Sequence, residues 1–571
     1  MKTYGHFSKM IPLSVFLLLT GFSFDLSAQY LPEEPVTIDV DFNNTVGDMD
    51  PVWAFWGHDE PNYTYMKDGQ KLLTELAELS PVPVYMRVHS LLVTGEGTHA
   101  LKWGSTNAYT EDANGNPVYD WTIIDKIFDS YIERGMKPMA QIGFMPKALS
   151  SRPEPYRHYW KPGARYEEIY TGWAYPPNDY EKWAELVYQW VKHSVDRYGK
   201  EEVESWYWEV WNEPNIGYWQ GTLEEYIKLY DYSADAVKRA LPTAKIGGPE
   251  TTGPGWDKAA DYLRKFLDHV SHGKNYATGE TGSPLDFITF HAKGNPKVVD
   301  GMVQMNMGAQ LNDISKGFEI VASYPEFKDL PIIIGESDPE GCAACSEADY
   351  PHNAYRNGTM YSSYTAASFA RKYALADHFD VNFLGAVTWG FEFEDQPWYA
   401  GFRDMATNGV DKPVLNVFRM FGMMQGNRVS VSGNMAYDFE AVRDESVRKA
   451  VPDVNAIATF GEHSATVMIW NYHDNNNLDV APALVELSLE NLPNTKVLMQ
   501  HYRVDQEHSN SYTYWKSIGS PQQPTAEEIA ALERAGQLDL YTSPEWVIPD
   551  NEMKLSIELP RQAVSLLRFT W

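Results

Sequence analysis

The sequence predicts an α/β protein, a (β/α)8 TIM barrel with an accessory antiparallel β-sandwich. The chain has 571 residues, which is more than one compact core needs and enough for a barrel of about 250 residues and a smaller domain. After Pro51 a strand, turn and helix pattern repeats about eight times, as parallel barrels require. From Val429 onward the helical periodicity fades, and short alternating runs separated by turn residues begin.

The first 28 residues are typical of an export signal. Lys2 and Lys9 flank the start, residues 11–24 form an apolar core, and Ala28 offers a small residue for cleavage. That core is too short to span a membrane comfortably. We therefore expect an exported protein without membrane insertion, periplasmic or extracellular after removal of residues 1–28.

The next segment predicts a strand far from its partners in the sequence. Residues 36–42, Val-Thr-Ile-Asp-Val-Asp-Phe, alternate apolar and acidic side chains, which favours a half-exposed antiparallel strand over a barrel strand. We assign residues 29–50 to this strand, which joins the later β-domain, residues 51–428 to the barrel, and residues 429–571 to the β-sandwich.

Eight buried-strand patterns and the helical segments between them define the predicted barrel. The strands are expected at residues 52–56, 84–89, 138–144, 206–212, 245–248, 287–291, 332–336 and 384–389. Helices are expected at residues 180–198, 223–240, 256–270, 307–324 and 359–379. The active site of such a barrel lies at the carboxyl ends of its strands.

Charge and aromatic content restrict the class of partner. The formal charge of −31 argues against binding of nucleic acid or other polyanions over the whole surface. The 19 Trp and 36 Tyr residues suit stacking against sugar rings, although most are expected in the core. Two long aromatic or glycine-rich loops, at residues 91–120 and 145–177, favour a pocket for a terminal sugar, but they suit the interface of a homo-oligomer equally.

Cys342 and Cys345, in Cys-Ala-Ala-Cys, are the two cysteines of the chain. One such pair is too few ligands for a zinc site, and a redox motif needs a small βαβ context of its own. In an oxidising compartment the alternatives are a local disulfide or two free thiols. We favour a structural clip in a loop.

The nine residues Tyr207 to Asn215, Tyr-Trp-Glu-Val-Trp-Asn-Glu-Pro-Asn, predict the first catalytic group. Pro214 cannot donate to a sheet ladder, so the strand ends with Asn212 and Glu213 at its carboxyl end. A strand-end Glu is usually an ordinary turn residue, but this one lies beside indoles in an apolar setting. Desolvation would raise the pKa of the Glu213 carboxyl, as a general acid requires.

Glu336 supplies a second carboxylate three predicted strands later. Pro331-Ile-Ile-Ile-Gly-Glu336 is a buried strand that ends in an acid. The carboxyl ends of strands four and seven face each other across a barrel mouth. Two carboxyl groups roughly 5 to 5.5 Å apart are what glycoside hydrolysis with retention uses.

These motifs resemble glycoside hydrolase family 39, the family of β-xylosidases and α-L-iduronidases, over roughly residues 36–426. The matching pieces are Arg87-Val-His89, Trp211-Asn-Glu-Pro-Asn215, Gly247-Gly-Pro249, Asp286-Phe-Ile-Thr-Phe-His291-Ala-Lys293-Gly294, Glu336 and Trp389. The resemblance implies that Glu213 is the acid/base and Glu336 the nucleophile, with no cofactor. It also implies an oligosaccharide or polysaccharide substrate from which a terminal sugar is released, a pentose such as xylose or arabinose.

Six further residues fit substrate-binding roles in this scheme. Asn212 can bind the sugar 2-hydroxyl, and Arg87 can keep Glu336 ionised. His89 and His291 can bind hydroxyls or orient the nucleophile, and Trp389 can form the floor of the first sugar subsite. Lys293 departs from the Tyr that many xylosidases of the family carry.

Because Lys293 stands where many xylosidases of the family have Tyr, the sequence leaves the identity of the substrate undecided. His-x-Lys-Gly and Glu-x-Asp-Pro look more like the iduronidase branch, and a Lys can pair with a substrate carboxylate or donate to a neutral hydroxyl. The alternative function is therefore an iduronidase-like hydrolase of a uronate-bearing glycan, with Arg403 as the nearby guanidinium.

Two other classes of function fit the sequence less well than hydrolysis by paired carboxylates. A glycan-binding protein without activity has no need for both carboxylates at strand ends. A metal-dependent barrel hydrolase needs clustered ligands such as His-x-His on strand one, where this chain has Trp53, Trp56 and an isolated His58. We assign no catalytic metal.

Overall fold

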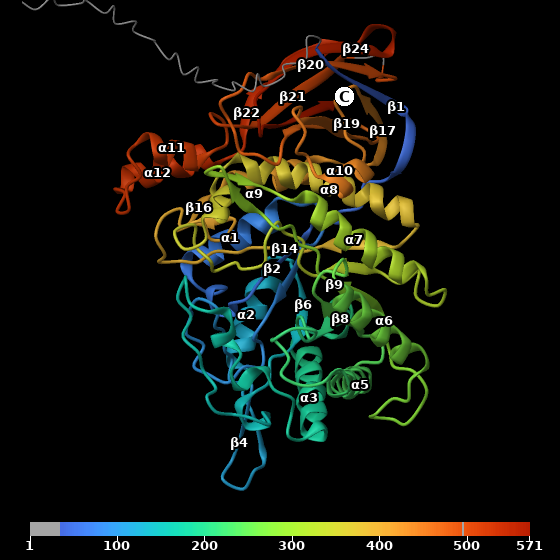
Figure 1. Cartoon of the computed structure of the whole chain (residues 1–571), viewed down its shortest axis with the longest axis vertical. Coiled ribbons are helices and arrows are strands. Elements are labelled where there is room, and N and C mark those ends of the chain that lie inside the picture. Colours follow the sequence, from blue (N-terminus) through green and yellow to red (C-terminus); the bar gives the residue numbers. More distant parts are fainter. Residues whose placement is uncertain (1–34, 494–495) are drawn as a thin grey trace, which may run out of the picture.

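A computed structural model describes residues 35–493 and 496–571, so the predicted signal peptide lies outside the described residues. Its central feature is a parallel sheet in the order β13-β12-β9-β8-β7-β6-β3-β2-β14 (Figure 1). The strands are β2 (Phe55–His58), β3 (Tyr85–Val88), β6 (Lys137–Ile142), β7 (Tyr207–Val210), β8 (Lys245–Thr251), β9 (Phe287–Phe290), β12 (Ile332–Ile334), β13 (Phe383–Ala386) and β14 (Thr388–Trp389). The predicted barrel is confirmed.

The eighth predicted strand closes the ring in two pieces. β13 pairs with β12, whereas β14, which follows after Val387, pairs with β2 in parallel. The first strand therefore lies between β3 and β14, so both ends of the sheet meet.

Helices follow the strands around the barrel. They are α1 (Lys67–Glu78), α2 (Thr122–Ile132), α3 (Tyr180–Tyr198), α4 (Lys200–Glu204), α5 (Leu223–Ala240), α6 (Asp257–His272), α7 (Met307–Ala322), α8 (Thr359–Phe379) and α9 (Pro413–Met423). Local sequence sets their starts: the Asp179 side chain caps α3, and Thr222 with Glu225 forms a capping box on α5. The predicted bounds of α3, α5 and α8 agree with these residues.

A second, mostly antiparallel sheet covers one side of the barrel. Its order is β22-β21-β25-β19-β18-β17-β1-β20-β24, with β23 beside β21. The strands are β1 (Val36–Asp48), β17 (Asn427–Gly433), β18 (Asp453–Phe460), β19 (Ser464–Tyr472), β20 (Ala483–Glu490), β21 (Lys496–Val504), β22 (Asp539–Thr542), β23 (Glu545–Val547), β24 (Glu552–Leu559) and β25 (Val564–Thr570). Inward side chains from both halves share one core, so the sheet is curled into two packed layers.

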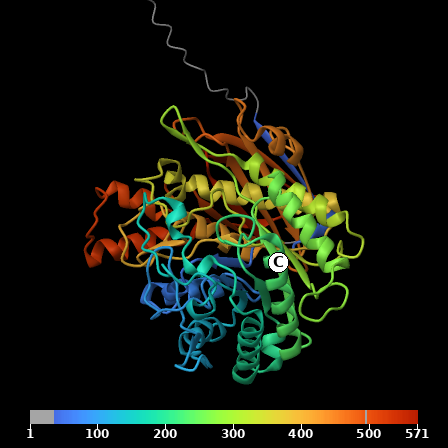
Figure 2. The same ribbon diagram turned by 60° about the horizontal axis from the view of Figure 1, so that its bottom comes forward.

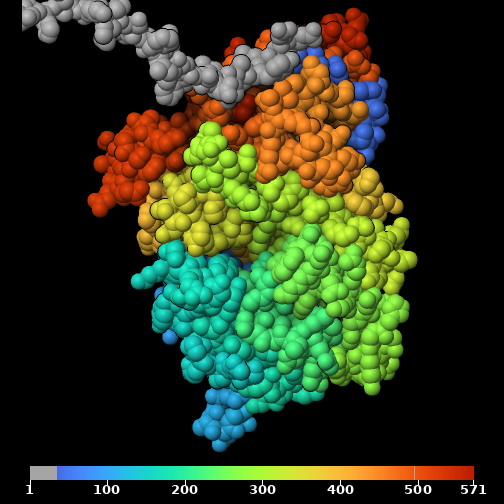
Figure 3. All heavy atoms as spheres, viewed as in Figure 1, coloured from blue at the N-terminus to red at the C-terminus, as the bar shows by residue number. Residues whose placement is uncertain are grey.

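The N-terminal strand β1 joins this sheet, as its alternating sequence predicts. Its buried residues alternate with more exposed ones from Val36 to Phe42. It is antiparallel to β17 but parallel to β20, so the expectation of an antiparallel strand is correct on one side only. The space-filling view shows this blue segment lying against orange and red ones from the end of the chain (Figure 3).

Helices α8 and α9 lie between barrel and second sheet (Figure 1). Trp470 and Leu566 point from the second sheet into the same hydrophobic core that holds the barrel residues. This shared core joins the two sheets. Among the helices of the described chain, none combines the length and apolar character needed to cross a bilayer.

Shorter elements shape the loops. The hairpin β4 (Tyr109–Glu111) and β5 (Pro117–Tyr119) lies within the first long loop, and the 3-10 turns Lys147–Leu149, Tyr166–Ile169 and Gly172–Ala174 lie within the second. The other elements are β10 (Lys297–Val299), β11 (Met302–Gln304), β15 (Ala406–Thr407), β16 (Val410–Asp411), α10 (Phe439–Glu445), α11 (Ser511–Ser517) and α12 (Ala526–Gly536). The last two helices stand out from the molecule in both ribbon views and pack on the barrel through Trp398 and Tyr399 (Figure 2).

Candidate active site

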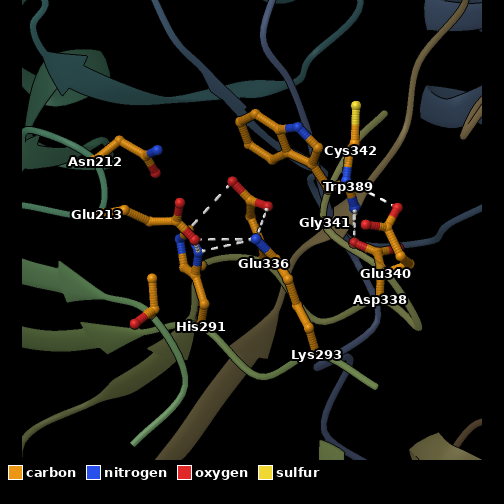
Figure 4. Close-up of polar contacts among 12 residues, drawn as sticks. Asn212, Glu213, His291, Lys293, Glu336, Asp338, Glu340, Gly341, Cys342 and Trp389 are labelled. Atoms are coloured by element: carbon orange, nitrogen blue, oxygen red, sulfur yellow. Dashed lines mark hydrogen bonds and ion pairs between the residues drawn. The ribbon is translucent and has the colours of Figure 1, made fainter. Parts of the chain in front are cut away.

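The two predicted catalytic carboxylates meet at the carboxyl ends of the barrel strands. Glu213 follows β7 and Glu336 follows β12, and Figure 4 shows their side chains pointing towards each other. The ammonium of Lys293 lies 3.1 Å from Oε1 of Glu213 and 2.7 Å from Oε2 of Glu336. Those two oxygens are therefore at most about 5.8 Å apart.

The backbone around Glu213 is held in an uncommon conformation. Trp211 and Glu213 have φ angles of 70° and 42°. Residues other than Gly rarely adopt positive φ angles. The amide of Glu213 donates to the carbonyl of Glu250 at 2.9 Å, and the indole of Trp211 donates to the carbonyl of Tyr218 at 3.0 Å. These contacts hold the turn that directs the carboxylate inward.

The charges around the two carboxylates favour ionisation of both. Burial opposes ionisation of Glu213, but the charges of Lys293 and His291 outweigh it and hold the pKa of Glu213 well below its usual value. The pKa of Glu336 is likewise lowered, because Lys293 and His291 outweigh its burial. The expectation that desolvation raises the pKa of Glu213 is therefore wrong for the free site, since Lys293 and His291 both contact its carboxylate.

Arg87 connects the site residues beneath the two carboxylates. It is fully buried, and its Nε donates to Glu209 at 2.6 Å, while Nη2 donates to the side-chain oxygen of Asn212 at 3.0 Å. Nη1 lies 3.8 Å from Glu336, so the predicted effect on Glu336 is through charge and not through a hydrogen bond. The contact to the Asn212 oxygen fixes its amide group and leaves the amide nitrogen to donate elsewhere.

His89 and Trp389 pack together on one side of this group. Nδ1 of His89 lies 2.9 Å from Asp59, and Nε2 lies 3.1 Å from Nη1 of Arg87. Burial lowers the pKa of His89 to about 4. His89 is therefore neutral, with its proton on Nδ1 and its lone pair facing Arg87. The Trp389 ring lies 4.4 Å from the His89 ring, measured between centroids, and is buried; its role as a sugar platform stays a prediction.

His291 bridges two carboxylates. Its Nδ1 lies 2.8 Å from Oε1 of Glu213, and its Nε2 lies 2.7 Å from Oε1 of Glu250. Sequence reasoning missed Glu250 and its neighbour Glu209. Glu250 comes directly after the quoted Gly247-Gly-Pro249 motif near the end of β8, so the strand-end argument that identified Glu213 would have found it.

Arg403 lies on the other side of Glu336. Its side chain is fully buried. Nη2 donates to the carbonyl of Gly341 at 2.9 Å and lies 3.7 Å from Glu336. Nη1 contacts the carbonyl of Glu340 and lies 3.3 Å from Asp338. Both terminal nitrogens of the guanidinium thus face protein groups, whereas Nε has no hydrogen-bond partner among the described residues. Asp338 in turn accepts from the Trp389 amide at 2.7 Å.

A disulfide closes the loop that follows Glu336. Cys342 and Cys345 are bonded, with a Cα–Cα distance of 5.4 Å, which agrees with the predicted clip. Arg356 and the indole of Trp160 donate to the carbonyls of Cys345 and Ala344, at 3.2 Å each. The loop thereby connects the aromatic loop at residues 145–177 to the wall of the site.

A pocket beside this cluster extends into the loops. Its cavity volume is about 20 Å³, space for little more than one water molecule. Charged and aromatic groups line it: Asp59, His89, Lys102, Phe144, Trp173 and Tyr218. Asp59 and Lys102, which form a buried ion pair, were also missed by sequence reasoning. Asp59 follows β2 directly, which is the available signal, whereas Lys102 carries none.

A metal ion would need several His, Cys, Asp or Glu side chains gathered in one place. Within residues 35–493 and 496–571, no group of three or more His, Cys, Asp and Glu side chains has a suitable arrangement.

Comparisons with known proteins identify relatives of this chain in sequence and in fold. The β-xylosidase of Caldicellulosiruptor saccharolyticus is 28% identical over 464 residues, which cover 78% of this chain and 82% of the relative. The α-L-iduronidase of Mus musculus is 24% identical over 548 residues, covering 90% and 78%. A crystal structure of a monomeric β-xylosidase from Caulobacter crescentus CB15 has the same fold, with a TM-score of 0.71 at 22% identity over 94% of this chain and 99% of that one.

The family model for these enzymes covers most of the chain. It is described as glycosyl hydrolases family 39 and matches residues 36–544, which includes both candidate catalytic residues and most of the second sheet. The protein is therefore a glycosidase of glycoside hydrolase family 39, similar to β-xylosidases and with α-L-iduronidases among its relatives.

Proposed function

We propose that this enzyme is an exo-acting retaining glycosidase that releases a terminal pentose, xylose or arabinose, or a short sugar unit from plant or other complex polysaccharide. The observation that carries the proposal is the contact of one ammonium, that of Lys293, with both Glu213 and Glu336. It holds the two carboxylates at a separation that one covalent sugar intermediate can bridge.

The chemistry follows from the two positions. Glu336 attacks the anomeric carbon as the bond to the leaving oxygen breaks, and Glu213 delivers a proton to that oxygen. A water then displaces Glu336 from the anomeric carbon while Glu213 accepts the proton. Asn212, oriented by Arg87, binds the sugar 2-hydroxyl as positive charge develops on the ring.

The pocket supports removal of a terminal unit. Phe144, Trp173 and Tyr218 line it together with His89, and so little space beside the carboxylates leaves no room for a glycan chain to continue on that side, which favours the end of a glycan over its middle. An exported enzyme with the predicted signal at residues 1–28 would meet such glycans outside the cytoplasm.

The occupied cations favour a neutral sugar over a uronate. Lys293 contacts both catalytic carboxylates, and the Arg403 guanidinium faces two carbonyls and two carboxylates. A substrate carboxylate would have to displace one of these contacts. The iduronidase-like alternative remains the second candidate because Lys293 stands at a position where a substrate carboxylate could be met.

Aryl glycosides and natural oligosaccharides test the proposal together. We expect wild-type enzyme to hydrolyse an aryl pentoside faster than an aryl iduronide, and proton NMR of the first product to show the anomer of the substrate. Glu336→Ala should be inactive on both substrate types. Glu213→Ala should keep the first half-reaction on an activated aryl glycoside but lose activity on oligosaccharides, and azide should restore turnover by replacing the water that Glu213 activates.

Three outcomes would contradict the proposal. Inversion of the anomer would exclude the double displacement, and full activity of Glu336→Ala would remove that residue from the mechanism. Binding of glycans with no released sugar would favour a binding protein of this fold. Glu201→Ala, at an exposed position on α4, is the matched control for removal of a carboxylate.

A further inference from the structure

A chain of three buried groups runs from the acid/base away from the substrate. Glu213, His291 and Glu250 are joined by contacts of 2.8 Å and 2.7 Å through the two ring nitrogens of His291. The side chains of His291 and Glu250 have no solvent exposure. The surrounding charges keep both of these carboxyls ionised. Both ring nitrogens therefore have to donate to satisfy these contacts, and the ring is then an imidazolium.

The protein makes space for Glu250 in this position. Glu250 has a φ of 56°, so its backbone adopts a conformation that disfavours a side chain, as expected where a group is held for function. Gly335 lies against it: a Cβ at Gly335 would overlap Oε1 of Glu250. The residue directly before the nucleophile therefore has to lack a side chain for Glu250 to reach His291.

Arg87 and Glu209 complete the surroundings of Glu250. Nη2 of Arg87 lies 3.1 Å from Oε1 of Glu250 and Nε lies 2.6 Å from Glu209. Oε2 of Glu250 and Oε1 of Glu209 are buried without a hydrogen-bond partner among the described residues. Burial and the nearby charge of Glu250 raise the pKa of Glu209, so a proton on Glu209 can be shared with Glu250.

The charges that face His291 come from five elements. They are Glu213 after β7, Glu250 on β8, Glu336 after β12 at 3.9 Å, Lys293 after β9, and Asp313 on α7, with Arg87 and Glu209 behind Glu250. Burial lowers the pKa of His291, but the charges of Glu336 and Glu250 more than offset it, and the net pKa is raised. Burial opposes ionisation of Glu250 as well, yet Arg87 and His291 lower its pKa to about 2.

We propose that Glu250 is a positioning residue that makes His291 the proton store of the acid/base Glu213. This inference rests on the proposed function, because it concerns how Glu213 delivers its proton. The free carboxylate of Glu213 is ionised, and the proton needed by the leaving oxygen sits on Nδ1 of His291.

The proton balance closes over both half-reactions. As the glycosidic bond breaks, Glu213 transfers a proton to the leaving oxygen and receives the Nδ1 proton of His291. The imidazole becomes neutral and still donates Nε2–H to Glu250. When water attacks the anomeric carbon and releases Glu336, its proton passes to Glu213 and on to Nδ1. Glu250 itself exchanges no proton and contacts no substrate.

The pH dependence of kcat/KM on an oligosaccharide tests the role of Glu250. The basic limb reports loss of the proton from the Glu213–His291 pair. Glu250→Gln removes a negative charge from His291, so its pKa falls, and the basic limb should move to lower pH by about one unit or more. Glu201→Gln is the matched control: it makes the same change at an exposed carboxylate on α4, and the basic limb should stay in place.

Nitrogen-15 NMR of the histidines gives a readout that needs no turnover. The His291 signals, assigned among the 15 histidines by their loss in His291→Gln, should show both nitrogens protonated at pH 7 in wild-type enzyme. A neutral imidazole at that pH would overturn the inference even if Glu250→Gln failed to fold.

The outcomes separate the two proposals. A wild-type enzyme that hydrolyses no glycoside contradicts the proposed function, and the NMR measurement then decides on the proton store alone. An active enzyme whose basic limb is unmoved in folded Glu250→Gln contradicts the inference and leaves the proposed function in place.

Discussion

The ammonium of Lys293 lies 2.7 Å from Oε2 of Glu336 and is the shortest ionic contact of the candidate nucleophile. The same ammonium reaches Glu213, so one cation offsets the repulsion between two carboxylates that would otherwise shift each other's pKa. The charge state of the free site thus depends on a residue from a third strand end, after β9.

Removing the Lys293 charge should move the acidic limb of activity. The charge of Lys293 lowers the pKa of Glu336, and activity requires an ionised Glu336. In Lys293→Met the acidic limb of the pH profile of kcat/KM should therefore shift to higher pH by about one unit or more. Rates on an activated aryl glycoside between pH 3 and 8 measure this. Lys293→Arg keeps the charge and should keep the limb; an unchanged limb in Lys293→Met would contradict the role of this charge.

A methyl group at Gly335 should destabilise the protein. The new Cβ would overlap Oε1 of Glu250, and the buried Glu250 side chain has no free space, so overpacking should lower the free energy of unfolding by about 1–3 kcal/mol. Calorimetry measures the loss. Gly358→Ala, whose Cβ would meet only Tyr512 at 3.8 Å, is the matched control, and equal melting temperatures of the two variants would contradict the close packing.

The buried Lys372 on α8 should lower the free energy of unfolding at neutral pH relative to its value near pH 10. It is fully buried with no hydrogen-bond partner for Nζ among the described residues, and burial lowers its pKa to about 7. In the unfolded chain the Lys372 amine keeps its proton up to about pH 10.4. Between pH 7 and 10 the unfolded state therefore binds more protons than the folded state, and the free energy of unfolding rises with pH. Lys372→Met should raise the free energy of unfolding at pH 7 by about 2 kcal/mol or more.

The check for Lys372 is denaturant unfolding at several pH values. The advantage of Lys372→Met over wild type should shrink between pH 7 and 10, because the wild-type side chain is then neutral in both states. A difference that is constant with pH would mean that packing, and not the charge, sets the effect.

The disulfide should contribute modestly to stability. It closes a loop of three residue steps, for which the chain-entropy account gives about 2 kcal/mol. The loop is also held by Arg356, Trp160 and Arg403, so the double variant Cys342→Ser, Cys345→Ser should remain folded. Denaturant unfolding of this variant, beside wild type with and without a reducing agent, measures the change, and global unfolding on reduction would contradict it.

The barrel could be predicted from the sequence because its strands and helices have strong local patterns. Buried runs such as Ile332–Ile334 end at Pro, Gly or an acid, and the helix from Leu223 begins at a capping box, so each element is marked by nearby residues. The two carboxylates could be placed together because the strand order of a closed parallel barrel follows the chain order.

The electrostatics of the site could not be predicted in the same way. The sign of the pKa shift of Glu213 depends on Lys293 and His291, which lie some 80 residues later and reach it only in the folded barrel. Lys102 likewise meets Asp59 through a long loop of irregular structure. Such contacts depend on side-chain direction in three dimensions, which periodicity does not encode.

The position of β1 has a consequence for how the newly made chain acquires its structure. Thr37 pairs with Asn434 across 397 positions, and Asn491 reaches Asp41 across 450. During synthesis this segment is made some 400 residues before its partners, so it stays unpaired for longer than the strands of the βα units, which can assemble as they appear. Its alternating acidic residues keep the waiting segment hydrated and make it a poor template for pairing with other chains.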